Sequence, residues 1–507
     1  MKAFLLHPTV NFDLTQALPR HAAILRQDLE LDLLLKAMAG EDEFLLEVAR
    51  KVVLLGFGND VQTILYRHDV LRDSLKYPAL IRQMYAFSVE AVEAKRKSYW
   101  SFASEHPSSV LHGSIDVLRM FMEVLKKMKA LADQQREGQF KSSGVSDFIA
   151  MLGVEFGDAY FASVDGYLRE LKFDAGILLS AVLGPGNEGT DFVLLRPNDD
   201  GPGFLQRILG NAPASYTFRL SERDETGAKA VAAMRNQGIN RVANALAQSM
   251  EHIFAFFQML RTELAFYVGC LNLHERLESA GMPTAMPELA RNGVGPRHFS
   301  GLYDPCLALS VGRGHAVVGN TLSMEHKRIV VITGANQGGK SSFLRSIGLA
   351  QIMLQSGMFV SADHFSGSVC NGLYTHYKRE EDPGMISGKL DEELGRMNVI
   401  AEDIHPDAMM LFNESFASTN EREGAEIARQ ITQALLERRI VVYFVTHLYT
   451  FAHSLFESGR EDALFLRAQR LDDGTRTFRL VEGKPLETSY GQDLYQEVFH
   501  ETPFGVS

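Results

Sequence analysis

Hydrophobic positions in the first 285 residues recur mostly at the spacing of amphipathic helices. Apolar residues return every three or four positions in the stretches 29–55, 80–104 and 117–135. From 228 to 280 no proline occurs in 53 residues while apolar residues keep returning. This pattern predicts a very long helix, typical of a lever, with Gly238 and Gly269 as the points where it would break.

Two other patterns interrupt or follow these helices. Between residues 177 and 220 the runs ILLSAVLG, TDFVLLRP and SYTFRLS are separated by turn residues, which predicts a small β insertion. After Pro283 and Pro287, short apolar runs alternate with helical patterns: VVITG, MMLFNE and VVYFVTH each precede a helix. That alternation predicts an α/β domain with a largely parallel sheet buried on both faces.

The length of 507 residues favours two or three domains. We therefore expect a helical region at 1–285 and an α/β domain at 286–507, an α plus α/β multidomain chain. Composition is ordinary for a globular protein, with 46% hydrophobic and 22% charged residues. No run of 18 uncharged apolar residues occurs and the N-terminus lacks a signal-peptide pattern. The expectation is a cytoplasmic protein without a membrane span.

Composition also narrows the chemistry. The three cysteines are odd in number and widely spaced, which predicts reduced thiols and argues against a disulfide framework or structural zinc. The sixteen histidines show no metal-ligand spacing. The formal charge of −12 does not favour a nucleic-acid partner, although a basic stripe on one face is compatible with it.

One segment carries a strong chemical signal. The apolar run from Val330 leads into Gly334, Gly339, Lys340 and Ser341, which fit the pattern G-x-x-x-x-G-K-[ST]. Glycines let backbone N–H groups surround phosphate oxygens, the lysine reaches the β- and γ-phosphates, and the serine hydroxyl ligates Mg²⁺. The segment predicts a nucleoside triphosphate site.

The next two apolar strands end in residues that suit hydrolysis. The run 409–414 ends in Asn413 and Glu414, where a carboxylate polarises the attacking water and the preceding position helps to hold Mg²⁺. Asn413 offers a neutral oxygen where an Asp is usual, so weaker metal binding and slow turnover are expected. The run 441–447 ends in His447, placed to contact the γ-phosphate or its water, though a histidine at a strand end is more often structural.

Together these segments resemble the ATPase domain of the MutS mismatch-repair family, a branch of the ABC-type ATPases. The likeness rests on four stretches: TGANQGGKSS at 333–342, LFNESFASTNEREG at 411–424, FVTH at 444–447 and SYG at 489–491. The second keeps the family's Glu, one Thr at Thr419 and the closing glycine at Gly424. The likeness is strong over about 300–495, whereas the upstream helices resemble the family's core and lever only in pattern.

The resemblance implies a long-helix core and lever region with a small β insertion, followed by a P-loop ABC-type ATPase domain. It implies ATP and Mg²⁺, with Ser341 and Asn413 at the metal and Lys340, Glu414 and His447 as catalytic residues. It also implies a homodimer in which a signature serine, here Ser387 beside Gly388, closes the partner's site. The nucleotide cradle it implies consists of Gly334, Asn336, Gly338, Gly339, Lys340, Ser341 and Ser342.

The same resemblance implies DNA, mismatched or structured, as a partner and raises a MutL-like protein as another. Three departures stand against the pattern. The helical sequence begins near residue 20, which points to a short member lacking the mismatch-recognition and connector domains. Phe121-Met122-Glu123 is a coincidental match to the family's mismatch wedge, since it lies within an amphipathic helix. Phe416-Ala417 also replaces a Gly-Arg pair.

DNA contact would come from the helical arm, where the basic residues cluster at 95–97 and 126–129, followed by Arg136 and Lys141. Such clusters are more often the solvated face of a helix. The resemblance therefore predicts an ATP-dependent DNA-binding protein of mismatch repair or related DNA repair, in which ATP binding and hydrolysis drive dimer closure around DNA. Two alternatives remain open: a binder of branched or recombination DNA without mismatch reading, and a nucleotide-switched dimeric scaffold that does not bind DNA.

Overall fold

The computed structural model describes residues 2–97, 106–136, 138–174, 176–196, 217–290, 293–312, 317–379, 388–471 and 475–486. The chain forms two compact units. Unit 1 comprises Met1–Ala3, Arg82–Gln139 and Ser146–Arg261, and unit 2 comprises Phe4–Ile81, Phe140–Val145 and Thr262–Ser507. Helices α5, α7 and α10 each run from one unit into the other. The domain boundary expected at residue 286 stays a prediction, because the compact units divide the chain differently.

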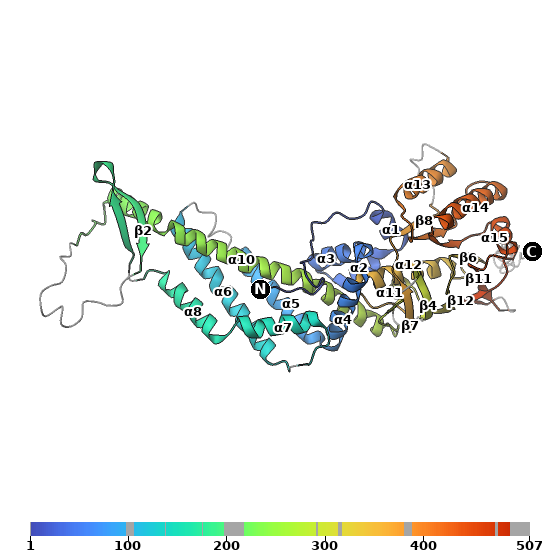
Figure 1. Ribbon diagram of the computed structural model, residues 1–507, viewed down its shortest axis with the longest axis horizontal. Helices are drawn as coiled ribbons and strands as arrows, with labels where there is room; N and C mark the ends of the chain where they lie inside the picture. The colour runs from blue at the N-terminus through green and yellow to red at the C-terminus, as the bar shows by residue number, and fades with distance from the viewer. Residues whose placement is uncertain are drawn as a thin grey trace, which may run out of the picture. The chain divides into compact units, whose positions relative to one another are not determined.

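Unit 1 is built from long helices and one hairpin (Figure 1). Helix α6 packs on α8, and Phe121 of α6 lies 5.4 Å, centroid to centroid, from Phe257 of α10. Phe121 is thus a core residue, in agreement with the expectation that Phe121-Met122-Glu123 belongs to an amphipathic helix. The elements contributing to unit 1 are α5 (Pro78–Lys97), α6 (Pro107–Asp133), α7 (Ser143–Glu155), α8 (Asp158–Glu170), β1 (Leu178–Leu183), β2 (Gly189–Leu195) and α10 (Glu225–Ser279).

Helix α10 confirms the predicted long helix, with 55 residues and no break at either glycine. Both glycines are instead sites of close approach. A Cβ at Gly238 would lie 2.3 Å from a methyl carbon of Leu179, and one at Gly269 would lie 3.3 Å from Met38. By length and composition α10 alone among the described helices is apolar enough to cross a membrane, yet 72% of its most apolar window is buried inside the structure.

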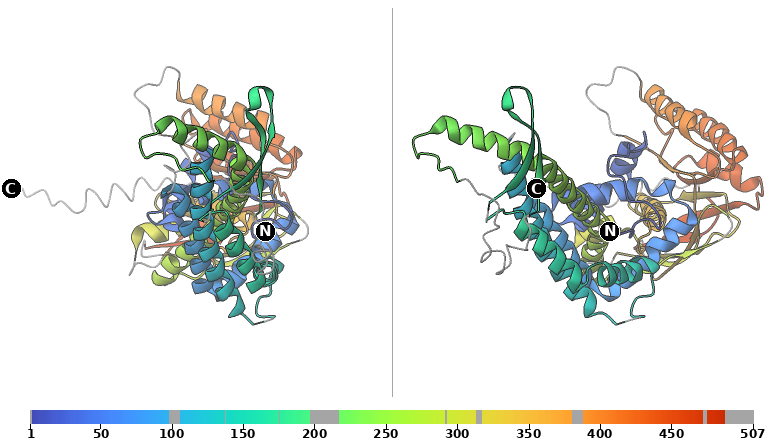
Figure 2. Two further views of the ribbon diagram at one scale, coloured as in Figure 1. Left: turned by 90° about the vertical axis from the view of Figure 1, so that its left-hand side faces the viewer. Right: turned by 60° about the vertical axis from the view of Figure 1, so that its left-hand side comes forward.

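The predicted small β insertion is confirmed as a hairpin, which has two strands among the described residues. Strands β1 and β2 pair antiparallel, and the hairpin lies beside the N-terminal part of α10 (Figures 1 and 2). Of the third predicted run, residues 217–220 are described and are not a strand, and 215–216 lie outside the described residues. A hairpin leaves most of its side chains without a packing face, and Val182 and Leu183 are 61% and 75% exposed.

The described residues of unit 2 form two sheets. Six strands follow the order β12-β11-β6-β10-β9-β8, all parallel except the pair β11–β12, and a four-stranded sheet follows the order β3-β7-β4-β5. The strands of the six-stranded sheet are β6 (Ile329–Thr333), β8 (Leu373–Tyr377), β9 (Met409–Asn413), β10 (Val441–Val445), β11 (Ala463–Arg470) and β12 (Arg476–Glu482). Those of the other are β3 (Glu288–Leu289), β4 (Gly295–Leu302), β5 (Asn320–Ser323) and β7 (His364–Ser368). The three predicted apolar strands are confirmed as β6, β9 and β10.

The central strands are buried on both faces, as their unbroken apolar sequence predicts. Met410 and Phe412 of β9 point into a core formed with α13, α14 and α15, while Leu411 faces Gly348 of α12 on the other side. The described α-helices that lie wholly in unit 2 are α1 (Ala22–Asp28), α2 (Leu31–Ala39), α3 (Glu43–Leu54), α4 (Val61–Lys76), α11 (Pro305–Val311), α12 (Lys340–Ser356), α13 (Lys389–Asp403), α14 (Glu421–Glu437) and α15 (Tyr449–Glu457). The chain is therefore an α plus α/β protein, helix-rich with mixed sheets.

Parallel strands end at the same edge of a sheet. Strands β6, β9 and β10 are neighbours, so the residues that follow Thr333, Asn413 and Val445 meet at one edge. In open α/β sheets this carboxyl edge is where ligands bind.

Candidate active site

The loop between β6 and α12 has a backbone that glycine permits and other residues resist. Gly334 and Gly339 have φ angles of 119° and 87°. A Cβ at Gly334 would lie 2.9 Å from the backbone nitrogen of Ala468, and one at Gly338 would lie 2.7 Å from the Ala468 side chain. These approaches to β11 explain the glycines sterically and leave a tight loop at the N-terminus of a 17-residue helix.

Lys340 is the first residue of α12 and is 4% exposed. Its Nζ donates hydrogen bonds to the carbonyl oxygens of Gly334, at 3.0 Å, and Ala335, at 2.8 Å. Burial lowers the pKa of Lys340, while the negative charge of Glu414 acts in the opposite direction. The ammonium therefore lies inside the curve of the loop, close enough to Glu414 for the two charges to interact.

Ser341 and Asn413 face each other across the sheet edge. The Ser341 hydroxyl donates to Oδ1 of Asn413 at 3.0 Å, joining the helix start to the end of β9. Two neutral oxygens thus lie side by side where the sequence predicts a magnesium ion. Among the described residues no group of three or more His, Cys, Asp or Glu side chains could hold a metal by itself. A cation here would need phosphate oxygens and water as further ligands, which suits Mg²⁺.

Glu414 and His447 form the next pair along the edge. His447 Nε2 lies 3.2 Å from Glu414 Oε1, and the two side chains are 42% and 30% exposed. This hydrogen bond is the main cause of the lowered pKa of Glu414, which the positive charges of Lys340 and Lys378 lower further against the effect of burial. The carboxylate is therefore ionised at neutral pH and partly open to solvent, as a base requires.

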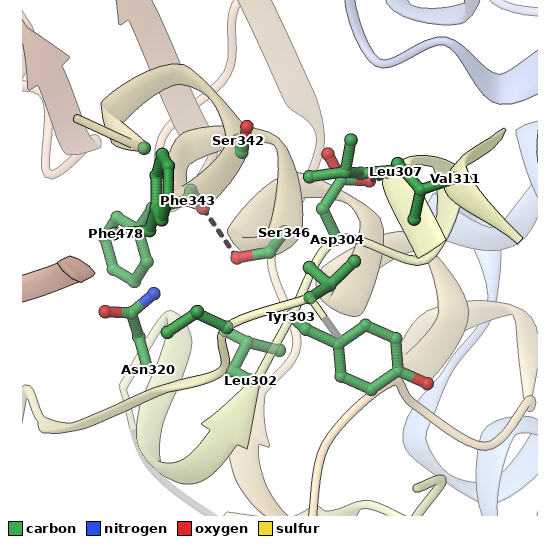
Figure 3. Close-up of a pocket in the computed structure, with 13 residues that line it drawn as sticks. Leu302, Tyr303, Asp304, Leu307, Val311, Asn320, Ser342, Phe343, Ser346 and Phe478 are labelled. Carbon is green, nitrogen blue, oxygen red and sulfur yellow. Dashed lines mark hydrogen bonds between the residues drawn. The ribbon is translucent and has the colours of Figure 1, made fainter. Parts of the chain in front are cut away.

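An apolar cavity of about 180 Å³ lies beside the start of α12 (Figure 3). Its walls come from β4, β5, α11, α12 and β12, and Phe478 of β12 lines it together with Ser342 and Phe343 of α12. Asn320 lies near Phe478 in the same wall and accepts a hydrogen bond from the Leu480 backbone N–H of β12 at 2.8 Å. The sequence reasoning missed this cavity, since no motif connects segments so far apart.

The hairpin β11–β12 also supports the loop directly. Arg476 of β12 donates to Oε1 of Gln337 at 2.7 Å, and Gln337 has the left-handed φ of 58°. The backbone oxygen of Phe478 would lie 3.1 Å from a Cβ at Gly339. Gln337 occupies a variable position of the G-x-x-x-x-G-K-[ST] motif, so the motif does not predict this contact. It is seen only in the folded structure, where Arg476 of β12 reaches the loop.

Of the remaining predicted site residues, some lie among the residues that the structure describes and some lie outside them. Gly388 is the N-cap of α13, whereas Ser387 and the segment 489–491 lie outside the described residues. Asn336 and Ser342 belong to the loop and to the first turn of α12. Gly424 has a steric reason of its own, since a Cβ there would lie 2.3 Å from the Phe416 carbonyl oxygen.

The basic clusters of unit 1, at 95–97 and 126–129, differ from the sheet edge in the contacts that their side chains make. Four of their lysines form ion pairs with acidic residues of the same unit. The pairs are Lys95 with Glu251 at 2.6 Å, Lys126 with Glu123 at 2.7 Å, Lys127 with Glu90 at 2.7 Å and Lys129 with Asp133 at 2.5 Å. Lys95 also lies 3.8 Å from the Phe254 ring centroid. The pairing fits the solvated-face interpretation of these clusters better than a DNA contact.

Comparisons with known proteins match both parts of the chain. The model of the MutS2 N-terminal domain matches residues 59–280, and the model of MutS domain V matches residues 330–500. Together they cover more than three quarters of the sequence, including the helical region that resembles the family only in pattern.

Three curated relatives illustrate the similarity. The chain is 28% identical to the endonuclease MutS2 of Thermus thermophilus over 249 residues, 48% of this chain and 33% of that protein. It is 28% identical to the DNA mismatch repair protein MutS of the same species over 184 residues, 36% and 22% of the two chains. It is 27% identical to the mouse MutS protein homolog 4 over 189 residues, 34% and 19%. The chain thus covers a fifth to a third of each relative.

Proposed function

Because the chain belongs to the MutS family, we propose that it is a DNA-repair ATPase that binds ATP with Mg²⁺ at the carboxyl edge of the six-stranded sheet. One observation carries the proposal. The loop residues Lys340 and Ser341 lie beside Asn413 and Glu414, with His447 3.2 Å from the carboxylate. This arrangement supports a phosphate-binding loop, a metal-binding oxygen pair and a water-orienting base in one site, which is what a P-loop ATPase needs.

The residues at the sheet edge fit both ATP and Mg²⁺. The positive φ angles of Gly334 and Gly339 give the loop its tight curve at the N-terminus of α12, where a phosphate would lie, and the cavity beside Ser342 and Phe478 offers an apolar wall for a nucleobase. Ser341 and Asn413 would hold the magnesium ion, which when bound neutralises charge on the phosphate oxygens. Asn413 supplies no charge to that ion, so we expect weak metal binding and slow turnover.

In the proposed reaction a water molecule attacks the γ-phosphate in line with the leaving group. Glu414 orients that water and accepts its proton, since its lowered pKa keeps it ionised. Lys340 stabilises the negative charge that develops on the phosphate oxygens. His447 holds the Glu414 carboxylate through the hydrogen bond between them.

We propose further that two copies form composite sites, with Ser387 and Gly388 closing the partner's nucleotide, and that closure moves the helical arms around DNA. A specific observation favours a second candidate, the nucleotide-switched scaffold. Four lysines of the predicted DNA-contacting clusters are paired with acids. A binder of branched DNA without mismatch reading is the third candidate.

The test is ATP turnover by the wild type and by Glu414→Gln, each without DNA and with homoduplex, mismatched duplex or a four-way junction. We expect slow wild-type turnover that one DNA alters, and a loss of about 10² in the variant. A preference for the junction would favour the branched-DNA function. Turnover indifferent to every DNA would favour the scaffold, and turnover equal in wild type and variant would refute the assignment of Glu414.

A further inference from the structure

The turn that follows β9 has an unusual backbone. Glu414 and Phe416 have left-handed φ angles of 54° and 62°, a conformation that residues with a Cβ resist. Such residues persist only where their surroundings hold them in place. The candidate base therefore lies on a turn whose geometry depends on other parts of the fold.

Helix α13 supplies one hold through Glu393, which is 3% exposed. Its Oε2 accepts a hydrogen bond from the Phe416 backbone N–H at 3.0 Å, and its Oε1 accepts one from the Ser418 hydroxyl at 3.1 Å. One carboxylate thus bridges two residues of the turn. Sequence reasoning did not mark Glu393, which is one acid among several in a charged helix.

Strand β8 supplies a second hold through His376. Its Nε2–H donates to the Glu393 carbonyl oxygen at 3.0 Å, since a carbonyl can only accept. Burial lowers the pKa of His376 to about 4, so the ring is neutral and Nδ1 is an acceptor. The Ser415 hydroxyl proton is shared between that Nδ1, at 2.7 Å, and the His376 carbonyl, at 2.6 Å. The residue directly after Glu414 is thereby tied to α13 as well.

We propose that Glu393 is a positioning residue for Glu414: by bridging Phe416 and Ser418 it fixes the turn that aims the catalytic carboxylate at the attacking water. The inference rests on the proposed ATPase function. It assigns no contact between Glu393 and the nucleotide. Instead, loss of the carboxylate would leave the buried Phe416 N–H without an acceptor, and the turn would relax.

The consequence for catalysis is large because a base works only within hydrogen-bond reach of the water. A displacement of about 1 Å can cost about 10²-fold in rate. We therefore expect Glu393→Ala to lower kcat about 10²-fold. The dissociation constant for ATP should stay within about twofold, since Lys340 and the loop glycines are not touched.

Three variants separate positioning from general damage. Glu393→Gln can still accept from Phe416 N–H with its amide oxygen and donate to the Ser418 oxygen, so it should recover most of the activity. Ser418→Ala removes only one bond and should lose a few-fold in kcat, which keeps a test available if Glu393→Ala fails to fold. Glu402→Ala removes an exposed acid of the same helix that accepts a hydrogen bond from Asn398 at 3.0 Å, and it should behave as wild type.

Two further readouts exclude a merely structural role. Glu414 is faced by His447, Lys340 and Lys378, which hold its pKa low. When the turn relaxes in Glu393→Ala, those contacts weaken and the pKa rises, so the acid limb of the kcat profile should move to higher pH. Adding Glu393→Ala to Glu414→Gln should cost nothing more, since the two changes remove one function.

The outcomes distinguish two failures. Absence of turnover in the wild type would refute the proposed ATPase function. Wild-type turnover with unchanged kcat in Glu393→Ala and Ser418→Ala would refute the positioning role alone, as would a loss in kcat that is additive with Glu414→Gln. A folded Glu393→Ala variant whose only defect is weaker ATP binding would also overturn it.

Discussion

The sheet edge of unit 2 and the basic clusters of unit 1 both carry polar residues that the sequence predicts to be functional. The contacts that these residues make in the structure are different. At the sheet edge Lys340 and Ser341 of α12 converge with Glu414, which follows β9 in a distant part of the sequence. In the arm, charges such as Lys126 and Lys127 form ion pairs with neighbouring acids on exposed helix faces. Convergence from distant parts of the chain is costly to arrange and indicates a site, whereas pairing along a surface is the ordinary condition of a soluble helix.

The largest expected effect comes from removing the loop lysine. Lys340→Ala should lower kcat/KM for ATP by about 10³-fold, because the charge that stabilises the transferred phosphoryl group is lost. Calorimetric titration with ATP measures the accompanying loss of affinity. Lys484→Ala, which removes an exposed lysine paired with Glu457 at 3.2 Å, is the matched control. Unchanged ATP affinity in Lys340→Ala would show that the loop is not the nucleotide site.

The pair His447 and Glu414 gives the next effect, about tenfold. In His447→Ala the carboxylate loses the hydrogen bond that is the main cause of its lowered pKa, so that pKa rises. A base must be ionised to act, and a higher pKa means that it becomes protonated at a higher pH. The acid limb of the kcat profile should therefore shift upward while kcat on the plateau falls about tenfold. A profile with an unmoved acid limb would contradict the coupling of the two residues.

A substitution at Asn413 tests the metal site. Its expected effect is smaller than the two above, and it strengthens metal binding instead of weakening catalysis. Asn413→Asp adds a charged oxygen 3.0 Å from the Ser341 hydroxyl, and we expect a severalfold lower magnesium concentration for half-maximal turnover. Turnover as a function of Mg²⁺ measures it. Asn371→Asp, at an exposed amide that bonds the Pro406 carbonyl, controls for added charge. If Asn413→Asp needs more magnesium than wild type, the residue does not lie at the ion.

The same contrast explains how far the sequence alone could lead. The strands β6, β9 and β10 were predictable because an apolar run indicates a buried strand, and the polar residue that follows it indicates where the strand ends. The parallel pairing then brings Glu414 and His447 together. The long helix was also predictable, but its two glycines were not, since their reason lies in the approach of Leu179 and Met38 from elsewhere in the chain.

The sequence alone could not predict contacts between residues that lie far apart in the chain. Phe478 at the cavity, Arg476 at the loop and Glu393 at the turn stand in no local motif, and each acts on a residue at least 23 positions away. Of the third strand-like run of the insertion, the described residues 217–220 form no strand. The domain boundary and the roles of the site residues stay predictions.

The smallest expected effect concerns the arm. Alanine at both Lys126 and Lys127 should change DNA affinity by less than about twofold, because each lysine is already neutralised by Glu123 or Glu90. Anisotropy titrations at several salt concentrations measure both affinity and its salt dependence. Alanine at Glu123 and Glu90 instead frees the two lysines and serves as the reciprocal control. If the lysine variant binds DNA more than tenfold less tightly and its salt slope falls by about two, both lysines contact phosphates, and the arm is a DNA-binding surface in spite of its ion pairs.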